Sequence, residues 1–410
     1  MKRLVFVSSA QPAANPRLVK ELRWISRFNF TITVIYAPIS PWADEFDIQI
    51  KRELKHIEWV SAVPTEKQYS IIHYWARLRR RWWLWVGRIT NGNVFTAAKG
   101  LTLFSQELAH QASRYPADVY VGHNLGALPA VVKAAKRFHA KACFDLEDFH
   151  SGEMSHGSIE QKMVQQLEAT YLPLTSGLTV SSPLIHACYH NQFPELSFLT
   201  IPNVFPYRAL RVNRLVERND PPRLSMIWFS QFVGNDRGIE CIIQAMGKCR
   251  NPAVRLTLVG NCTSSKKKQL LTLAQQSQVH SDSIVFVNAM SEEDLAVLCS
   301  QHDIGLAPEL NKQRDKEVAW TNKLFFYSAS GIPVVASATE GQLLFMNNFT
   351  DAGSVFPIGD AEALAADIQL YMDDSSLLVR QRKAIQKHFM DIYELEGKKW
   401  CEYITSVLDR

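Results

Sequence analysis

Several features that define common protein classes are missing from this 410-residue sequence. Its seven cysteines are scattered and no two form a CxxC pair, which argues against a disulfide framework or a zinc site. No apolar run approaches the roughly 20 residues that a membrane-spanning helix needs. The net charge of +5 at pH 7 is too small and too dispersed to indicate nucleic-acid binding by itself. No internal repeat or low-complexity segment appears either.

The length and composition are those of a globular protein with about two domains. Hydrophobic residues make up 47% of the chain and charged residues 21%, which is enough for two sizeable cores. The segment from Met1 to Ser9 is too short for a signal peptide and looks like a first strand. The scattered cysteines are typical of free thiols in a reducing compartment. Together with the short first strand, they predict a cytoplasmic protein, either free or bound peripherally to the inner face of the membrane.

Short apolar runs alternate with helical periods in the first half of the chain. Strands are predicted at residues 4–8, 31–36, 57–63, 119–121, 141–145, 178–181 and 199–201. Helices are predicted at residues 17–28, 95–115, 126–139, 159–171 and 182–192. Strands separated by helices of this length indicate a doubly wound parallel sheet.

The alternation pauses after Ile201 and resumes from about residue 224. The second series contains strands at residues 224–230, 255–259, 284–287 and 304–307, with helices at 239–248, 266–276 and 292–300, and helical periods in 361–410. We therefore expect an α/β protein with two Rossmann-like domains of doubly wound parallel sheet. The predicted parts are an N-terminal domain (1–205), a polar, proline-bearing linker (206–222), a C-terminal domain (223–390) and a C-terminal helix (391–410).

The most informative stretch runs from Trp320 to Ser337. Its pattern predicts a loop, a short helix that opens at Thr321 or Asn322, a glycine turn and a buried strand. The free amide groups at such a helix start bind anions, and Lys323 adds a positive charge beside them. This predicts a phosphate-binding helix start. An ordinary helix–strand unit of a Rossmann-like domain is the alternative.

A second segment, from Ser230 to Glu240, follows the first strand of the second half and carries Arg237 in a glycine-containing loop. Polyphosphates commonly bind where a strand is followed by such a loop, a basic residue and the start of a helix. The alternative for Arg237 is an ordinary surface loop.

The stretch at Asn322 resembles the NKxxEYxAxGxPVVA signature of retaining GT-B glycosyltransferases of family 4, where it helps to hold the diphosphate of a sugar nucleotide. The loop with Arg237 is similar to the family segment whose basic residue contacts that diphosphate. The turn at Gly260 and Asn261 and the loop at Met290 resemble the segments near the nucleobase. The resemblance implies a GT-B fold with two domains that face across a cleft, and a last helix that crosses back to the N-terminal domain.

In the N-terminal half, the NPRxxKE element with Asn15 and Arg17 resembles the family's first loop, which faces the cleft. Small residues replace the paired glycines of many relatives, so direct phosphate contact is not expected there. His123 ends a predicted strand, at the edge where open α/β sheets bind ligands. It matches the family's histidine that approaches the donor sugar, and a packing or capping role is the alternative. Asp145 and Glu147 also end a strand and are candidates for the acceptor side.

The sequence departs from the family at two acidic positions. Most family members carry two glutamates eight positions apart, and here those positions hold Val318 and Phe326. Trp320 matches the aromatic residue between them, while Glu309 and Glu317 are the candidates that replace the sugar contact. Either the nucleotide is held differently, or the donor is unusual, or activity is lost.

A helical pattern dense in tryptophan and arginine runs from Tyr74 to Ile89. One face of this helix carries Tyr74, Leu78, Trp82, Trp85 and Ile89, and arginines 77, 81 and 88 lie on or beside another. Three roles are open: contact with an anionic membrane, packing on the N-terminal domain, and binding of single-stranded nucleic acid. Nucleic acid is the least favoured of the three and is not expected as a partner.

The resemblance implies a retaining glycosyltransferase that moves a sugar from a nucleoside diphosphate sugar to a glycan or lipid-linked acceptor. Arg237, Lys323 and the helix start would stabilise the leaving diphosphate, and His123 would orient the donor sugar. This arrangement needs no metal and no cofactor besides the sugar nucleotide, and the sequence has no DxD-type or His/Cys ligand cluster at a suitable strand end. The rivals are a non-catalytic homologue that acts as a binding subunit and a sugar-nucleotide epimerase.

Overall fold

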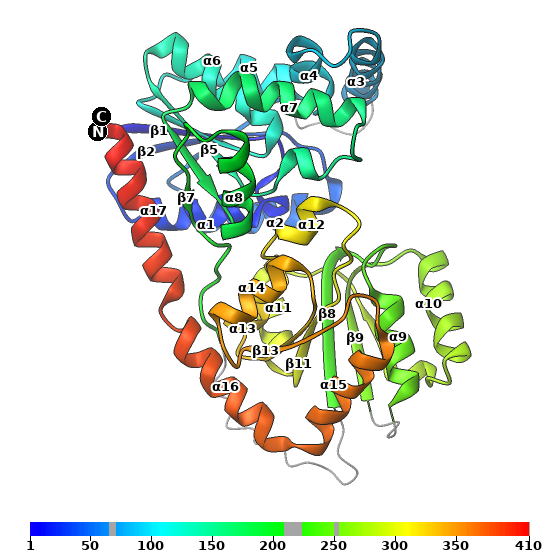
Figure 1. Cartoon of the computed structure of the whole chain (residues 1–410). Helices are drawn as coiled ribbons and strands as arrows, with labels where there is room; N and C mark the ends of the chain where they lie inside the picture. Colours follow the sequence, from blue (N-terminus) through cyan, green and yellow to red (C-terminus); the bar gives the residue numbers. More distant parts are fainter. Residues whose placement is uncertain (65–70, 209–223, 250–253, 410) are drawn as a thin grey trace. The chain divides into compact units, whose positions relative to one another are not determined.

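The apolar runs of the sequence form two parallel sheets, each in its own unit of the computed structural model (Figure 1). The structure describes residues 1–64, 71–208, 224–249 and 254–409. The first unit contains Met1–Pro202, Gln313–Asp315 and Glu396–Arg410, and the second contains Asn203–Lys312 and Lys316–Leu395. Most of the predicted linker (206–222) lies outside the described residues.

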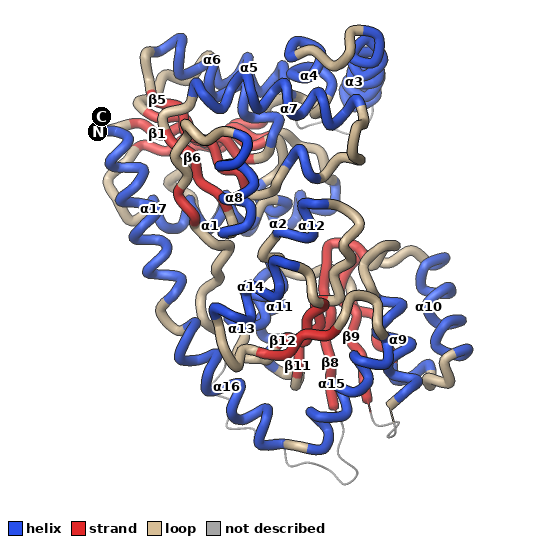
Figure 2. Tube along the Cα trace, in the orientation of Figure 1, coloured by secondary structure: helices blue, strands red, loops and turns tan. Residues whose placement is uncertain are grey.

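Seven strands make the sheet of the first unit (Figure 2). They are β1 (Arg3–Ser8), β2 (Thr31–Tyr36), β3 (Glu58–Ser61), β4 (Val119–His123), β5 (Lys141–Leu146), β6 (Gly177–Val180) and β7 (Leu199–Thr200). All pairs are parallel and the order is β3-β2-β1-β4-β5-β6-β7. The strand order therefore reverses between β1 and β4, which is the switch point where ligands bind in such sheets. The seven predicted strands are confirmed.

Helices flank this sheet because each crossover between parallel strands requires one. They are α1 (Pro16–Ile25), α2 (Asp44–Glu53), α3 (Ile71–Ile89), α4 (Val94–Gly100), α5 (Ser105–Ala112), α6 (Leu128–Phe138), α7 (Ile159–Tyr171) and α8 (Pro183–Gln192). Short 3₁₀ helices lie at Pro12–Ala14, Pro41–Ala43, Leu125–Ala127, His150–Gly152, Leu172–Leu174 and, in the second unit, Ser281–Ser283. Polar caps set several helix starts: the side chains of Asn15, Ser158 and Ser182 accept from amides of the first turn.

The prediction of one helix over residues 95–115 is wrong, because the chain breaks into α4 and α5. The break follows Gly100, where a Cβ atom would lie 3.2 Å from Trp83 of α3. Glycine is a poor helix former, and here it also permits close packing against the neighbouring helix. The helix α2 was not predicted.

Six parallel strands form the second sheet in the order β10-β9-β8-β11-β12-β13. They are β8 (Leu224–Phe232), β9 (Val254–Asn261), β10 (Ile284–Val287), β11 (Ile304–Ala307), β12 (Val334–Ser337) and β13 (Gly353–Phe356). The order reverses between β8 and β11, so this sheet has its own switch point. The predicted strands are confirmed, while the edge strand β13 was not predicted.

The second unit is helical on both sides of its sheet. Its helices are α9 (Ile239–Lys248), α10 (Ser264–Gln276), α11 (Glu292–Ser300), α12 (Arg314–Val318), α13 (Asn322–Ala329), α14 (Glu340–Asn348), α15 (Ala361–Asp373) and α16 (Ser375–Phe389). The core contains Trp228, Ile242, Leu258 and Ile368, all fully buried. A separate aromatic cluster of Trp320, Phe325, Phe345, Phe349 and Phe389 joins α13, α14 and α16.

The last helix, α17 (Ile392–Asp409), packs against the first unit from Glu396 onward. Trp400 is buried against Phe6 of β1 and Trp24 of α1, with ring centroids 6.3 Å apart in both pairs. The hydroxyl group of Tyr403 accepts from the amide of Leu178 at 2.9 Å. Gly397 lies so close to Trp24 that a Cβ atom would meet its Nε1 at 2.5 Å.

We expect Gly397→Ala to destabilise the protein although alanine favours helices. The helix propensity gain is about 1 kcal/mol, while forcing a methyl group into packed contact with Trp24 costs about 1–3 kcal/mol. The control is Gly234→Ala, because nothing lies within 4 Å of a Cβ atom at Gly234. Urea unfolding of both variants measures the difference. A Gly397→Ala protein more stable than the wild type would contradict the packing argument.

Candidate active site

The carboxyl ends of β8 and β11 lie at the switch point of the second sheet, where these two strands pair. The loop after β8 carries Arg237, and the loop after β11 carries Glu309. The hydroxyl group of Ser337, at the end of β12, donates to the carbonyl oxygen of Glu309 at 2.6 Å. Residues that are far apart in the sequence therefore meet at the edge where open parallel sheets bind ligands.

Gly238 fixes the two loops against each other. Its φ of +70° is in the left-handed region, and a Cβ atom would lie 2.0 Å from the carbonyl oxygen of Pro308. Only glycine fits such a close approach in this conformation. The neighbouring Arg237 is half-buried and has no ion-pair partner among the described residues. Its charge is close enough to Glu309 to lower the pKa of that carboxyl group.

The main ion pair of this edge joins Lys323, in the first turn of α13, to Glu309. The Lys323 Nζ donates to Glu309 Oε1 at 2.6 Å, and both residues are buried. The same ammonium group lies 5.5 Å from the ring centre of Trp228, a residue of β8 that was not predicted to belong to the site. Burial raises the pKa of Glu309, but the charges of Lys323 and Lys316 lower it by more, so the net pKa is below its ordinary value. The carboxylate therefore holds the lysine in one position.

The start of α13 is where the sequence predicts it. The helix begins at Asn322 with Thr321 in the N-cap position, but the Thr321 side chain does not cap the helix. Its hydroxyl group is buried and has no hydrogen-bond partner among the described residues. The side-chain oxygen of Asn322 instead accepts from the amide group of Asn203. The first amides of α13 thus lack a side-chain cap and can bind an anion.

Val318 and Phe326, which the resemblance places at the family's two glutamate positions, are core residues. Val318 is fully buried, and Phe326 contacts the rings of Phe205 and Phe229 with centroids 5.0 Å apart. Trp320 belongs to the aromatic cluster described above. The carboxylate of Glu317 accepts from the amide of Glu340, at the start of α14, at 3.4 Å. Sugar contacts by Glu309 and Glu317 stay predictions.

The residues predicted near the nucleobase lie at the ends of β9 and β10. The carbonyl oxygen of Asn261 accepts from the amide of Val233 at 3.0 Å, which joins the end of β9 to the loop after β8. Gly260 lies against the backbone of Ser230, where a Cβ atom would be 2.4 Å from the carbonyl oxygen. Met290 is half-buried in the loop before α11. Their contact with a base stays a prediction.

In the first unit, Arg17 and Asp145 form a buried ion pair. The Arg17 Nε and Nη2 donate to the two carboxylate oxygens at 2.6 and 2.7 Å, and both side chains are at most 1% exposed. Arg17 Nη1 also donates to the carbonyl oxygen of Ile201 at 2.7 Å, and Thr179 donates to Asp145 at 2.5 Å. The pair therefore joins α1, β5, β6 and the segment after β7. An acceptor role for either residue stays a prediction.

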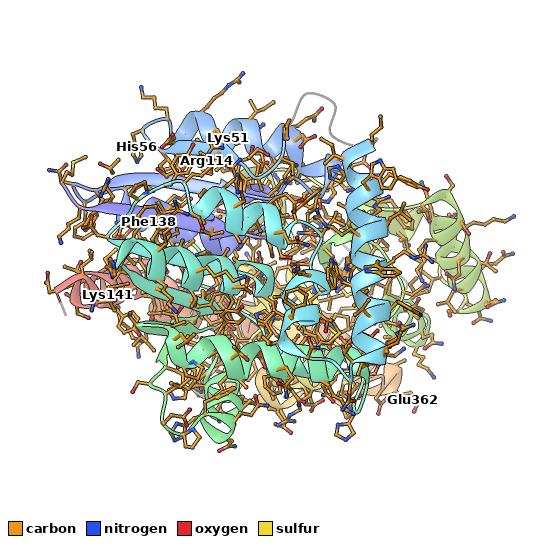
Figure 3. All side chains as sticks on the ribbon, turned by 90° about the horizontal axis from the view of Figure 1, so that it is seen from above. Lys51, His56, Arg114, Phe138, Lys141 and Glu362 are labelled. Carbon is orange, nitrogen blue, oxygen red and sulfur yellow. The ribbon has the colours of Figure 1, made fainter. Side chains whose placement is uncertain are left out.

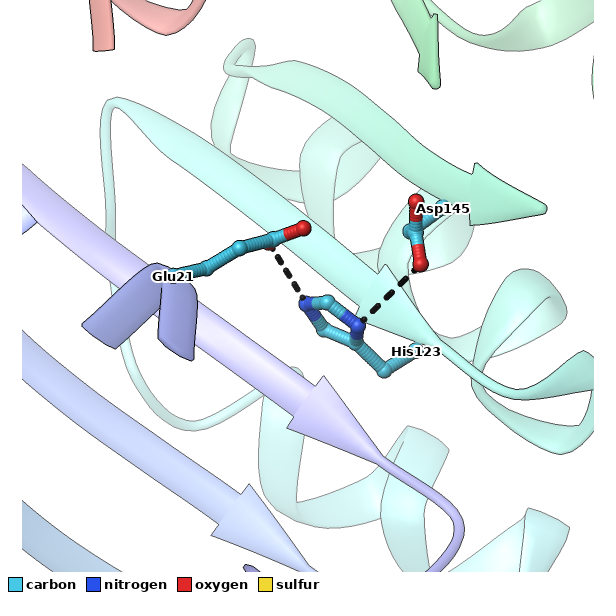
Figure 4. A group of neighbouring side chains, drawn as sticks. All are labelled: Glu21, His123 and Asp145. Carbon is cyan, nitrogen blue, oxygen red and sulfur yellow. Dashed lines mark ion pairs between the residues drawn. The ribbon is translucent and has the colours of Figure 1, made fainter. Parts of the chain in front are cut away.

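His123 ends β4 and lies between two carboxylates (Figure 4). Its Nε2 is 3.1 Å from Glu21 Oε2, and its Nδ1 is 3.7 Å from Asp145 Oδ2. Burial lowers the pKa of His123, but the charges of Glu21 and Asp145 raise it by more, so the net pKa is above its ordinary value. The site predictions did not include Glu21. Its position four residues after Arg17 places both on one face of α1, which is the signal that could have found it.

Glu21, His123 and Asp145 bring three possible ligand atoms within 4.8 Å of one another. The guanidinium group of Arg17 already pairs with Asp145 and lies 3.9 Å from Glu21. Arg17 already holds Asp145, and the raised pKa of His123 favours its protonated form, which has no free lone pair for a metal cation. The donor set therefore does not suit a metal.

The remaining acceptor-side candidates lie near the switch point of the first sheet. Asn15 caps α1 by accepting from the amide of Leu18 at 3.1 Å, and its own amide group donates to Asn124 at 3.2 Å. Glu147, after β5, has a raised pKa because of burial and the charge of Asp145, although Arg17 opposes this. The contact of these residues with an acceptor stays a prediction.

We expect Asp145→Asn to lower the free energy of unfolding by about 3–5 kcal/mol, because it leaves the buried Arg17 charge without its partner. The matched control is Glu53→Gln, which breaks an exposed pair with Arg23 whose atoms lie 2.8 Å apart. Exposed pairs contribute at most about 1 kcal/mol. Urea unfolding compares the two variants, and equal effects would contradict a special role for the buried pair.

We expect the buried Lys20 to make the free energy of unfolding depend on pH. Burial, with the nearby charge of Arg17, lowers its pKa from 10.5 to about 7. Between these values the folded state binds fewer protons than the unfolded state, so the contribution of Lys20 to stability rises with pH. The unfolding free energy of the wild type minus that of Lys20→Met should increase by about 2 kcal/mol between about pH 7 and about pH 9. A constant difference in urea titrations at the two pH values would contradict this.

Comparison with known proteins shows a family match in the second unit and similar folds among solved structures. Residues 223–374 match the family model described as glycosyl transferases group 1. No curated protein matches the sequence as a relative. Among solved structures, a sucrose-phosphate synthase from Thermosynechococcus elongatus has 16% identity and a TM-score of 0.69, and the match covers 99% of this chain and 100% of that one.

Two other similar structures were solved with ligands. HepE of Anabaena, in complex with UDP and glucose, has 14% identity and a TM-score of 0.70, with 99% of this chain and 100% of that chain covered. A TarM variant of S. aureus, in complex with UDP, Fondaparinux and alpha-GlcNAc-glycerol, has 9% identity and a TM-score of 0.67, with 100% of both chains covered. The predicted GT-B fold is confirmed. The chain therefore has the GT-B fold, and the match of its second unit to group 1 supports a glycosyltransferase.

Proposed function

We propose that this protein transfers a sugar from a nucleoside diphosphate sugar to a glycan or lipid-linked acceptor, with retention of the anomeric configuration. One observation carries the proposal: Arg237, the Lys323–Glu309 pair and the uncapped start of α13 converge at the switch point of the second sheet. This unit contains the match to group 1 glycosyltransferases. Two of the similar structures were solved with UDP, which makes uridine diphosphate sugars the first donors to test.

The proposed role of these residues follows from where negative and positive charge develop during sugar transfer. When the bond between the sugar and the diphosphate breaks, the sugar gains oxocarbenium character and the leaving phosphate gains negative charge. Lys323, held by Glu309, and the amides of α13 place fixed positive charge beside such a leaving group. Arg237 has no described ion-pair partner that a phosphate would have to displace. We propose that these groups take the place of a metal ion.

The two rival functions make different demands on the same site. A non-catalytic homologue accounts for Val318 and Phe326 as core residues, and it would show neither transfer nor donor hydrolysis. An epimerase would convert the donor with no acceptor present. The Lys323–Glu309 pair and Arg237, without a described ion-pair partner, favour a donor-binding enzyme over the non-catalytic rival, because a subunit that binds no donor does not need positive charge at this edge.

We expect Arg237→Ala to lower kcat/KM for the donor by about 100-fold, since it removes a charge that stabilises the leaving group. Lys323→Gln should have an effect of at least that size. The matched control is Arg255→Ala, an exposed residue of β9, which should leave kcat/KM unchanged. Release of the nucleoside diphosphate, measured with each of the UDP, GDP, ADP and dTDP sugars, identifies the donor.

Thermal unfolding with the same nucleotides separates the outcomes. Bound nucleotide raises the melting temperature of the wild type, and Arg237→Ala should require a higher nucleotide concentration for the same rise. Unaltered turnover in Arg237→Ala would contradict the proposed role of this residue. A folded wild type that no nucleotide stabilises would favour the non-catalytic rival, and conversion of the donor without acceptor would favour the epimerase.

A further inference from the structure

The helix α3 has two apolar faces, and only one of them packs on the first unit. On the packed face His73, Ala76 and Gly87 are buried, and a Cβ atom at Gly87 would lie 2.9 Å from the sulfur of Met163 in α7. Arg80 on the same face donates to the carbonyl oxygen of Gly100 at 3.2 Å. One face of α3 is thus fixed to α4 and α7.

The opposite face carries an exposed stripe that we call the aromatic stripe. Its members, with their exposed fractions, are Ile71 (68%), Tyr74 (59%), Trp75 (63%), Leu78 (38%), Trp82 (58%), Trp85 (52%) and Ile89 (65%). Apart from the adjacent Tyr74 and Trp75, these positions recur every three or four residues, so they share one side of the helix. Of the three roles left open, packing on the domain applies only in part: Trp83 contacts Phe95 with centroids 5.3 Å apart, while the stripe faces outward.

Arginines accompany the stripe along one flank. Arg77 and Arg81 are exposed, and in the described part of the chain neither forms an ion pair or hydrogen bond. Arg88, on the same flank, is 65% exposed and lies 3.2 Å from Glu160. Arg79 lies outside this flank and pairs with Glu107 at 2.7 Å. The flank therefore presents positive charge beside exposed indole rings.

We infer that the aromatic stripe docks on the surface of an anionic lipid bilayer. Tryptophan and tyrosine prefer the headgroup level of a bilayer, and arginines beside them are attracted to anionic lipids. A helix of 19 residues is about 28 Å long. This helix can lie in the plane of the membrane–water interface. Among the described residues every helix is too short or too polar to span a bilayer.

Charge favours a bilayer over a second copy of this chain as the partner of the stripe. Two copies that met through the stripe with their helices antiparallel would bring their arginine flanks toward each other, and like charges in an apolar contact are unfavourable. An anionic surface attracts the same arginines. In Figure 3, α3 (light blue) lies on the side of the first unit away from the labelled Arg114, Phe138 and Lys141. This separation provides control positions on the same unit. The inference rests on α3 alone and does not require the proposed donor site.

Flotation of the full chain with lipid vesicles tests the inference. The wild type should bind vesicles that contain phosphatidylglycerol and bind phosphatidylcholine vesicles much less. Arg77→Gln with Arg81→Gln should weaken binding by about tenfold or more, and Trp82→Ser with Trp85→Ser by a similar factor. These side chains are exposed, so circular dichroism and the melting temperature should not change.

Matched controls are Arg114→Gln with Lys136→Gln, which removes the same charge elsewhere on the unit, and Leu174→Ser, which removes an exposed apolar side chain. Both should bind as the wild type does. Several results would overturn the inference: no binding of the wild type to anionic vesicles, equal weakening by the controls, or a dimer that the tryptophan variant converts to a monomer without any vesicle binding. Binding of a single-stranded oligonucleotide in place of vesicles would also overturn it.

Discussion

Parallel strand order is the constraint on which the rest of this structure depends. Parallel strands all run in one direction and are joined by crossover helices. The loops that follow the strands therefore all lie at one edge of each sheet. In the second unit this edge brings Arg237 and Glu309 together from segments 72 positions apart, with Lys323 beside them. In the first unit it brings His123 to Glu21 and Asp145. The reversal of strand order beside the first strand of each sheet makes room for a ligand there.

The two edges differ in how their charges are paired. In the first unit the side chains of Arg17, Glu21, His123 and Asp145 are buried together, so their charges interact with one another inside the unit. In the second unit a single buried pair holds Lys323, while Arg237 and the start of α13 keep unsatisfied capacity for an anion. The difference supports the second unit as the place of the donor phosphates.

Much of the fold could be predicted because its signals are local. The apolar runs of the strands and the start of α13 are confirmed, since period and capping depend on neighbouring residues. The edge strand β13 and the helix α2 lack a strong apolar signal, and the one buried side chain of α2 is the carboxylate of Asp47. The break after Gly100 was missed because it depends on the packing of Trp83, which lies 17 positions earlier.

The sequence by itself determined most of the order of strands and helices, the fold class, and the segments that carry Arg237 and Lys323. Only the tertiary structure decided which of these charges have partners: Lys323 with Glu309, Arg17 with Asp145, and His123 with Glu21. It also decided that one apolar face of α3 is buried and the other exposed. The reason is that periodicity is set by residues close in sequence, whereas burial and ion pairing are set by distant segments that the fold brings into contact.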